Sequence, residues 1–233
     1  MKQKIPSPLR SLSRGEWGLW ILSLAVVSLS FFLSPEWDIL TWIASLIGVT
    51  ALIFVAKGMV VGQILTVVFA LFYAVISYDL RYYGEMITYL GMSAPTALAA
   101  VIAWLRHPYK NSGEVTVRRL SRRGLAGVFL LSLIVTAVFY FILRELGTAN
   151  LAVSTLSVST SFLASALTVL RSPLYALGYA ANDVVLIVLW MMAAAADISQ
   201  LPMVLCFVMF LVNDLYGFFN WYRMERRQAE NGE

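Results

Sequence analysis

The sequence predicts an all-α polytopic membrane protein, and three observations lead to this fold class. First, 60% of its 233 residues are hydrophobic and only 13% are charged, whereas soluble domains carry about 25% charged residues. Second, apolar runs recur along the chain, each long enough for a helix to cross a hydrocarbon core of about 30 Å. Third, Lys and Arg gather in alternate connections between these runs, which is the pattern that orients membrane helices.

We expect eight transmembrane helices, one for each apolar run. The first run follows a basic segment, as in a signal peptide, but Phe31, Phe32 and Leu33 provide no small residue for cleavage. We therefore interpret this run as an uncleaved first span. The approximate bounds of the runs are 17–33, 38–56, 60–78, 83–104, 124–143, 151–170, 173–195 and 201–222.

The basic residues predict the orientation of these spans. If the N-terminus lies inside, 15 of the 17 Lys and Arg residues fall on the cytoplasmic side and two on the external side. The positive-inside rule therefore places both termini in the cytoplasm. The longest connection, residues 105–123, holds six of these basic residues and divides the chain into two halves of four spans.

The two halves show a faint internal repeat. Ser13-Arg14-Gly15 before the first span resembles Ser121-Arg122-Arg123-Gly124 before the fifth, and Trp104 at the end of the fourth span matches Trp221 at the end of the eighth. Because each half contains an even number of spans, the halves would share one orientation, as parallel repeats do. For both tryptophans, the default expectation near a span end is interfacial anchoring, and for Trp221 the alternative is a role in the lumen of the bundle.

The last span carries a polar stripe within an apolar helix. At about 100° of rotation per residue, Asn213, Tyr216 and Asn220 fall on one face. Asn213 lies near mid-depth, where a polar group is costly unless it faces protein, water or a ligand. We therefore expect this face to point inward.

The seventh span carries a second polar stripe. Tyr179, Asp183 and Trp190 share one face, and Asn182 flanks it. Asp183 and Asp214 are the only acidic residues deep inside the predicted spans, and no Lys or Arg lies at a comparable depth. A buried carboxylate beside aromatic rings suits a flat, positively charged organic ligand. The alternative is that Asp183 fixes helix packing through a hydrogen bond to a neighbouring helix.

Other polar residues leave two interpretations open. The sixth span contains eight Ser and Thr residues between positions 154 and 168, which indicate either close helix packing or the lining of a pore. In the first half, Gln63, Tyr73 and Glu85 are candidates for a binding site, although each also suits a structural role.

The sequence does not favour an enzyme. No His, Cys, Asp or Glu cluster has the spacing of metal ligands, no glycine-rich loop suits a phosphate, and no base is placed for a serine nucleophile. We therefore expect no catalytic residue, no metal site and no cofactor. The basic residues lie where membrane topology explains them, so we expect no nucleic-acid partner.

The stretch Asn213 to Trp221, N-D-L-Y-G-F-F-N-W, resembles the PnuC-type nicotinamide riboside transporters. The same resemblance extends to Asn182-Asp183 followed by Trp190, and to Tyr83-Gly84-Glu85 at the start of the fourth span. It covers the chain from about the second span to the end.

One motif of that family is complete here and one is not. Asn213 and Tyr216 match its N-x-x-Y motif, whereas its W-x-x-W motif retains only Trp190, because Ala193 occupies the second tryptophan position. Relatives of this architecture carry thiamine or other vitamins, so the departure leaves the vitamin open.

The resemblance implies a SWEET-like arrangement of two parallel three-helix units joined by a linking helix, with an extra N-terminal helix. It also implies a homotrimer, facilitated diffusion, and trapping of the product by a cytosolic kinase. The expected segments are the cytoplasmic N-terminus 1–16, the extra helix 17–37, the first unit 38–104, the basic cytoplasmic loop 105–123, the linking helix 124–150, the second unit 151–222 and the cytoplasmic C-terminus 223–233.

We therefore predict a bacterial plasma-membrane transporter for nicotinamide riboside, a precursor of NAD. The rival hypotheses are a transporter of another vitamin such as thiamine, a proton-coupled transporter in which Asp183 carries the proton, and a membrane scaffold that transports nothing. The expected substrate-binding residues are Tyr179, Asn182, Asp183, Trp190, Asn213, Tyr216 and Asn220.

Overall fold

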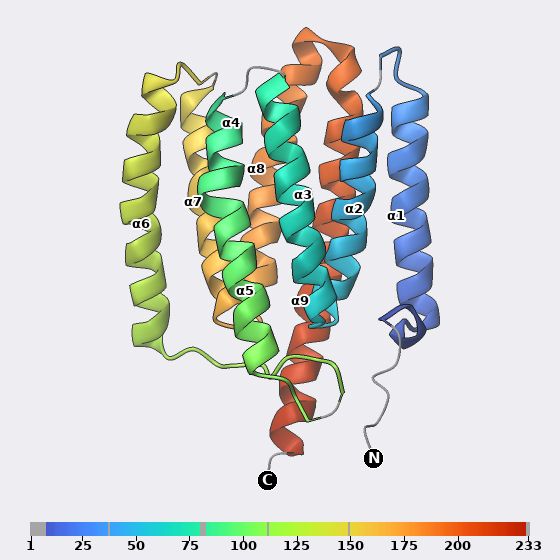
Figure 1. Ribbon diagram of the computed structural model, residues 1–233, viewed down its shortest axis with the longest axis vertical. Coiled ribbons are helices and arrows are strands. Elements are labelled where there is room, and N and C mark those ends of the chain that lie inside the picture. Colours follow the sequence, from blue (N-terminus) through green and yellow to red (C-terminus); the bar gives the residue numbers. More distant parts are fainter. Residues whose placement is uncertain (1–7, 37, 80–82, 111, 149, 232–233) are drawn as a thin grey trace.

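A computed structural model describes residues 8–36, 38–79, 83–110, 112–148 and 150–231. In this part of the chain the protein is a bundle of helices that stand side by side (Figure 1). Eight of its helical segments are long and apolar enough to cross a membrane. The predicted all-α polytopic fold and the count of eight spans are confirmed.

The fourth span has three helical parts, and each of the others is a single helix. Short 3-10 turns precede α1 and α9, at Pro8–Ser11 and Ile198–Gln200. The helices are α1 Arg14–Phe32, α2 Ile39–Ala56, α3 Val60–Asp79, α4 Tyr83–Thr88 with the π-helical turn Tyr89–Ser93 and α5 Ala94–Arg106, α6 Arg122–Glu145, α7 Leu151–Val169, α8 Tyr175–Ala196 and α9 Leu201–Glu230.

Several spans begin where a side chain caps the unpaired N–H groups of the first turn. The Ser13 hydroxyl accepts from the Glu16 N–H at 3.3 Å, and the Glu16 carboxylate accepts from the Ser13 N–H at 2.6 Å. Asp38 caps α2 and Ser121 caps α6 through their side-chain oxygens. Such caps satisfy backbone donors that have no partner inside the helix, and so set where a span starts.

The fourth span is irregular at its centre. In the turn Tyr89–Ser93, the Ala94 N–H bonds to the Tyr89 carbonyl, five residues earlier. Pro95 follows directly, and because proline has no N–H it cannot bond back to Gly91 as an α-helix requires. A π-helical turn of this kind widens a helix locally and is frequent at functional sites.

Two groups of three spans pack in the same way. In the first unit α2 packs on α3 and α3 on α5, and in the second unit α7 packs on α8 and α8 on α9. Between the units, α2 packs on α9 and α7 packs on α5. The first helix of each unit therefore meets the last helix of the other, which is the two-fold relation that parallel repeats produce.

Glycine allows the first two helices of each unit to approach closely. A Cβ atom at Gly62 of α3 would lie 2.4 Å from the Val55 nitrogen of α2, and one at Gly178 of α8 would lie 2.9 Å from the Ala164 Cα of α7. Both distances are too short for any larger residue without movement of the backbone. The two units thus share the same close contact.

The remaining spans lie at the edges of the bundle. Helix α1 packs on α2 and α9, whereas α6 packs on α7 (Figure 1). Most of the surface of α6 is apolar and exposed, because only 11% of its most apolar window is buried. Its outer face is therefore suited to lipid or to another apolar surface.

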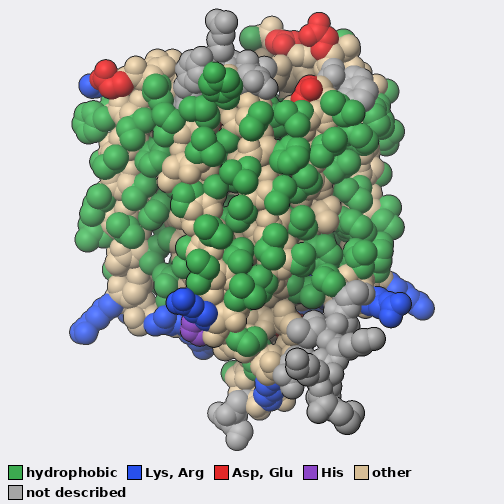
Figure 2. Space-filling model, in the orientation of Figure 1, with side chains coloured by type: hydrophobic (Ala, Val, Ile, Leu, Met, Phe, Trp, Pro, Cys, Tyr) green, Lys and Arg blue, Asp and Glu red, His purple; other side chains and the backbone are tan. Residues whose placement is uncertain are grey.

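The two ends of the bundle differ in charge. Blue Lys and Arg side chains lie at the end that holds the start of α1 and the end of α9, which we call the basic end (Figure 2). Red carboxylate groups lie at the other end, which we call the acidic end, and hydrophobic side chains cover the band between them. This is the surface of a protein that crosses a bilayer.

The basic loop between α5 and α6 docks on the last turns of α9. Gln228 accepts from the Val117 N–H at 2.8 Å and donates to the Val115 carbonyl at 3.0 Å. Arg119 pairs with Glu225 at 2.6 Å, and this carboxylate raises the pKa of the arginine. The projecting end of α9 and the loop therefore form one structure at the basic end.

Candidate functional site

A cavity of about 100 Å³ lies inside the bundle between the two units. This volume is below the roughly 300–1,000 Å³ of typical small-molecule pockets, so the cavity is largely closed. Among the described residues that line it there is no Lys, Arg or His. Its polar lining residues are Gln63, Thr66, Tyr89, Ser93, Ser161, Ser165, Tyr179, Asn182, Asp183 and Asp214.

Two carboxyl groups meet at this cavity. Asp183 comes from α8 and Asp214 from α9, and each is only 3% exposed. The two carboxyl groups interact with each other across the cavity lining. Asp183 Oδ2 has no hydrogen-bond partner within the described part of the chain. A buried carboxylate oxygen without a partner is costly in a membrane, and a bound cation would reduce this cost.

Neighbouring amide and hydroxyl groups surround the carboxyl pair. Asn182 Oδ1 accepts from Thr160 Oγ1 at 2.9 Å and from Ser157 Oγ at 3.3 Å. Ser165 Oγ and the Tyr179 hydroxyl lie 3.1 Å apart and share a hydrogen bond. These bonds orient Asn182 and Tyr179 from α7, the serine-rich helix.

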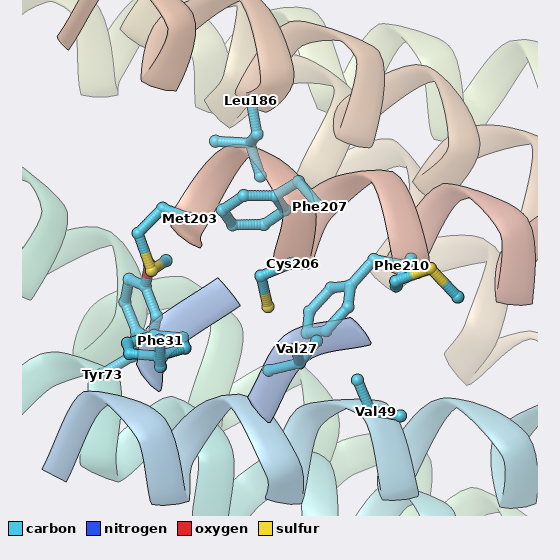
Figure 3. Close-up of a cluster of buried hydrophobic side chains, with 10 residues drawn as sticks. Val27, Phe31, Val49, Tyr73, Leu186, Met203, Cys206, Phe207 and Phe210 are labelled. Carbon is cyan, nitrogen blue, oxygen red and sulfur yellow. The ribbon is translucent and has the colours of Figure 1, made fainter. Parts of the chain in front are cut away.

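Aromatic rings form the apolar wall of the cavity. Phe69 lies 5.9 Å from Phe210 and 6.2 Å from Tyr89, measured between ring centroids, and Phe207 lies 5.4 Å from Phe210. All four residues line the cavity, and Figure 3 shows Phe207 and Phe210 in the buried cluster beside it. Aromatic faces attract cations and stack on flat rings, so this wall complements the carboxyl pair.

A second cavity, of about 40 Å³, leads from the first toward the acidic end. Its lining includes Glu85 of α4 and Thr148 of the connection between α6 and α7, which both lie near that end. The two cavities share five lining residues, which are Tyr89, Ser93, Ser161, Asn182 and Leu186. The two cavities are therefore neighbours, and together they outline a candidate path from near the acidic end to the carboxyl pair.

Two tryptophans pack together inside the bundle on the side of the basic end. Trp104 Nε1 donates to the Thr168 carbonyl at 3.0 Å, and Trp221 Nε1 donates to the Val55 carbonyl at 2.9 Å. The two rings lie 5.4 Å apart and are 1% and 0% exposed. The expectation that they anchor at the interface is wrong, because both side chains point into the bundle. Val55, whose carbonyl accepts the Trp221 hydrogen bond, is among the described residues that line the larger cavity, and the two tryptophans are not.

Three of the seven predicted site residues line the larger cavity. They are Tyr179, Asn182 and Asp183. Trp190 packs instead on the buried cluster that contains Leu186 and Phe207. Trp190 lies seven residues after Asp183, which is about 10 Å along α8 toward the acidic end. The two residues share one face of α8, but at the level of Asp183 this face lines the cavity, and at the level of Trp190 it packs on α9.

Two residues of the predicted stripe on α9 contact α1. Asn213 Nδ2 donates to Ser23 Oγ at 2.9 Å, and the Tyr216 hydroxyl donates to Glu16 Oε1 at 2.7 Å. Asn213 is buried and Tyr216 is half-buried, and this part of the stripe faces a neighbouring helix. Neither residue is among the described residues that line the cavity with Asp183, so their role in substrate binding stays a prediction.

Asn220 also lies outside the lining of the larger cavity. Its Nδ2 donates to the Ala56 carbonyl at the end of α2 at 2.8 Å. Close by, Lys57 pairs with Glu16 at 2.9 Å, so charged and polar contacts continue along this face. Asp214 follows Asn213 by one residue, and the helical rotation of about 100° turns it from this face toward the cavity.

Sequence reasoning missed the aromatic wall, because Phe69, Phe207 and Phe210 look like ordinary core residues in apolar helices. It left open the role of the hydroxyl groups of α7, and the structure places four of them in the cavity linings at a helical spacing. These are Ser154, Ser157, Ser161 and Ser165. Of the candidates in the first half, Gln63 and Glu85 line the cavities, whereas Tyr73 packs in the buried cluster.

Relatives of known name extend over most of the chain. The chain is 28% identical to the nicotinamide riboside transporter PnuC of Neisseria mucosa, over 91% of this chain and 82% of the relative. It is 21% identical to the protein of the same name from Haemophilus influenzae, over 90% of each.

A solved structure has the same fold. The crystal structure of the vitamin B3 transporter PnuC matches with a TM-score of 0.80 and 25% sequence identity, over 94% of both chains. The family model described as nicotinamide mononucleotide transporter matches residues 38–223, which hold both units and the carboxyl pair. The chain belongs to this family of membrane transporters.

Proposed function

We propose that the chain carries nicotinamide riboside across the bacterial plasma membrane. Both named relatives are nicotinamide riboside transporters, and the membership of a transporter family agrees with the expectation that the chain is not an enzyme. The observation that carries the proposal is the closed cavity in which a buried carboxyl pair faces an aromatic wall. Nicotinamide riboside is a flat pyridinium cation attached to a sugar. Its positive charge suits the carboxyl pair, and its flat ring suits the aromatic wall.

The bound riboside has a natural orientation in this cavity. Its pyridinium ring lies against the wall of Phe69, Tyr89 and Phe210, with its positive charge near Asp183. Its ribose hydroxyl groups bond to Asn182 and the nearby serines of α7, which can both donate and accept. Asp183, Asn182 and Tyr179 keep the role that the sequence predicted for them.

The basic end is cytoplasmic in this proposal, because the positive-inside rule places clustered Lys and Arg there. The polar path then leads to the cell exterior, and the Trp104 and Trp221 pair closes the cytoplasmic side. Transport requires the cavity to widen and this pair to separate, as rocking of two parallel units allows.

Trapping by phosphorylation complements this cavity. A phosphate would bring negative charge beside two carboxyl groups, and no Lys or Arg lines the described cavities to neutralise it. A cytosolic kinase therefore converts the riboside into a product that the carrier rejects. We propose facilitated diffusion on this basis, and a homotrimer in which the apolar face of α6 is available for contact.

The test is calorimetry on purified protein with nicotinamide riboside, nicotinamide, nicotinamide mononucleotide, thiamine and riboflavin. We expect the riboside to bind and the mononucleotide to bind at least about tenfold more weakly, because like charges in an interface cost energy. Selective binding of thiamine would assign the carrier to another vitamin.

A second measurement separates diffusion from coupled transport. Vesicles that contain the protein should equilibrate the riboside at the same rate with and without a proton gradient. Uptake that collapses when a protonophore is added, and that Asp183→Asn abolishes, would instead make the carrier proton-coupled.

A further inference from the structure

The charge of the cavity depends on a single pair of residues. Asp183 and Asp214 are the carboxyl groups of the larger cavity, and the titratable side chains that interact with them are Tyr89, Tyr175, Tyr179 and Cys206. None of these neighbours carries a positive charge. The pair has no counter-ion on any helix that faces it within the described residues.

The two carboxyl groups line one cavity, and each side chain is buried. Asp183 Oδ2 has no hydrogen-bond partner in the described residues. A ligand cation in the cavity would bring the positive charge that the lining does not provide, and an opposite charge nearby favours an ionised carboxylate.

We propose that the Asp183 and Asp214 pair reads the charge of the ligand ring, and that Asp214 is a specificity-determining residue which favours a pyridinium over a neutral ring of the same shape. This inference rests on the proposed function, because it concerns the same cavity. It adds a residue that the sequence motifs do not assign, and it predicts discrimination between two redox forms of one molecule.

The physical basis is that the pair acts on charge and the remaining lining acts on shape. The aromatic wall, Asn182 and the serines of α7 contact a riboside of either charge in the same way. Only the carboxyl pair distinguishes a ring that carries one positive charge from one that carries none. In a cavity from which water is excluded this distinction is stronger than at a surface.

The two redox forms of nicotinamide riboside provide a matched pair of ligands. The oxidised form has a pyridinium ring, and the reduced dihydro form has a neutral ring of nearly the same size. We expect the wild-type protein to bind the oxidised form at least about tenfold more tightly by calorimetry. Asp214→Asn, which keeps the side-chain volume and removes the charge, should reduce this preference to about threefold or less.

Two further variants control the comparison. Asp214→Glu retains the charge and should retain the preference, and Asp197→Asn removes an exposed carboxyl group at the acidic end without touching the cavity. Asn is also an effective capping residue, so the short turn after Asp197 should persist. In both variants the ratio of the affinities for the oxidised and the reduced riboside should equal that of the wild type.

The outcomes are distinct. If the wild type binds both redox forms equally, the charge-reading role is wrong and the proposed transport of the riboside stands. If the folded wild type binds neither form, the proposed function itself is wrong. A preference that persists unchanged in Asp214→Asn would assign the discrimination to Asp183 alone and overturn the role of Asp214.

Discussion

The two three-helix units share one scaffold and contribute different chemistry to the cavity between them. In each unit a tryptophan of the last helix donates a hydrogen bond to the other unit. Trp104 bonds to the carbonyl of Thr168 near the end of α7, and Trp221 bonds to that of Val55 near the end of α2. The first unit contributes neutral and aromatic groups to the cavity, among them Gln63, Phe69 and Tyr89, whereas both carboxyl groups come from the second unit. The tryptophan contacts are thus symmetric, and the placement of the carboxyl groups is not.

The last helices of the two units differ in the same sense. Helix α9 runs without interruption from Leu201 to Glu230, but its counterpart is broken by the π-helical turn Tyr89–Ser93. The turn places Tyr89 and Ser93 in the lining of both cavities. A repeated architecture therefore accommodates a widened helix on one side and a straight, charged helix on the other.

The largest expected effect concerns the symmetric contact. Trp104→Ala and Trp221→Ala each remove a fully buried ring and its hydrogen bond, so each should lower the free energy of unfolding by about 3–5 kcal/mol. Thermal unfolding in detergent measures both losses. Because the two hydrogen bonds occupy matching positions, the two decreases in the free energy of unfolding should agree within about 1 kcal/mol. A clear difference between the two variants would show that the two tryptophans do not contribute equally to stability.

A smaller effect concerns the two edge helices. Helix α1 is held by Glu16, Lys57 and Tyr216, whereas α6 packs mainly through apolar contacts with α7. Tyr216→Phe removes one hydrogen bond to a charged acceptor and should lower stability by about 1.5 kcal/mol. Calorimetry should show an unchanged affinity for the riboside, because Tyr216 lies outside the lining of the larger cavity. A large loss of affinity would show that Tyr216 belongs to the binding site.

The smallest effect tests the aromatic wall. Phe69 comes from the first unit and Phe210 from the second, and both face the same cavity. Phe69→Leu and Phe210→Leu keep the apolar volume and remove the ring face, so each should weaken riboside binding by about 0.5–1 kcal/mol. Equal losses by calorimetry would mean that both units contact the pyridinium, and a loss in one variant alone would place the ring on that side.

Helical periodicity predicted the fold and part of the site. It predicted the eight spans, and it predicted that Asn213 and Tyr216 share one face, which in the structure contacts α1. It could not show which neighbour that face meets, because spacing defines a direction around one helix and not the position of the next. Asp214 therefore proved to be the cavity residue, and Asn213 a contact of α1.

The two tryptophans show that a position along the sequence is also insufficient to predict a contact. Their repeat in the sequence was visible, but a position near a span end suggested an interfacial role for Trp104 and Trp221. Only the arrangement of the two units shows that the ends converge at the centre of the bundle. Contacts between helices that are distant in sequence depend on tertiary packing, which periodicity does not encode.

The docking of the basic loop on α9 has a consequence for how transport can be observed. Asp214 and Gln228 lie on one unbroken helix, about 21 Å apart at the usual rise per residue. Gln228 is bonded to Val115 and Val117 of the loop, so a rotation or tilt of α9 that begins at the cavity moves the loop with it. A movement of α9 inside the membrane would therefore change the position of the loop outside it. A spectroscopic label on the loop would report the conformation of the carrier without occupying the cavity.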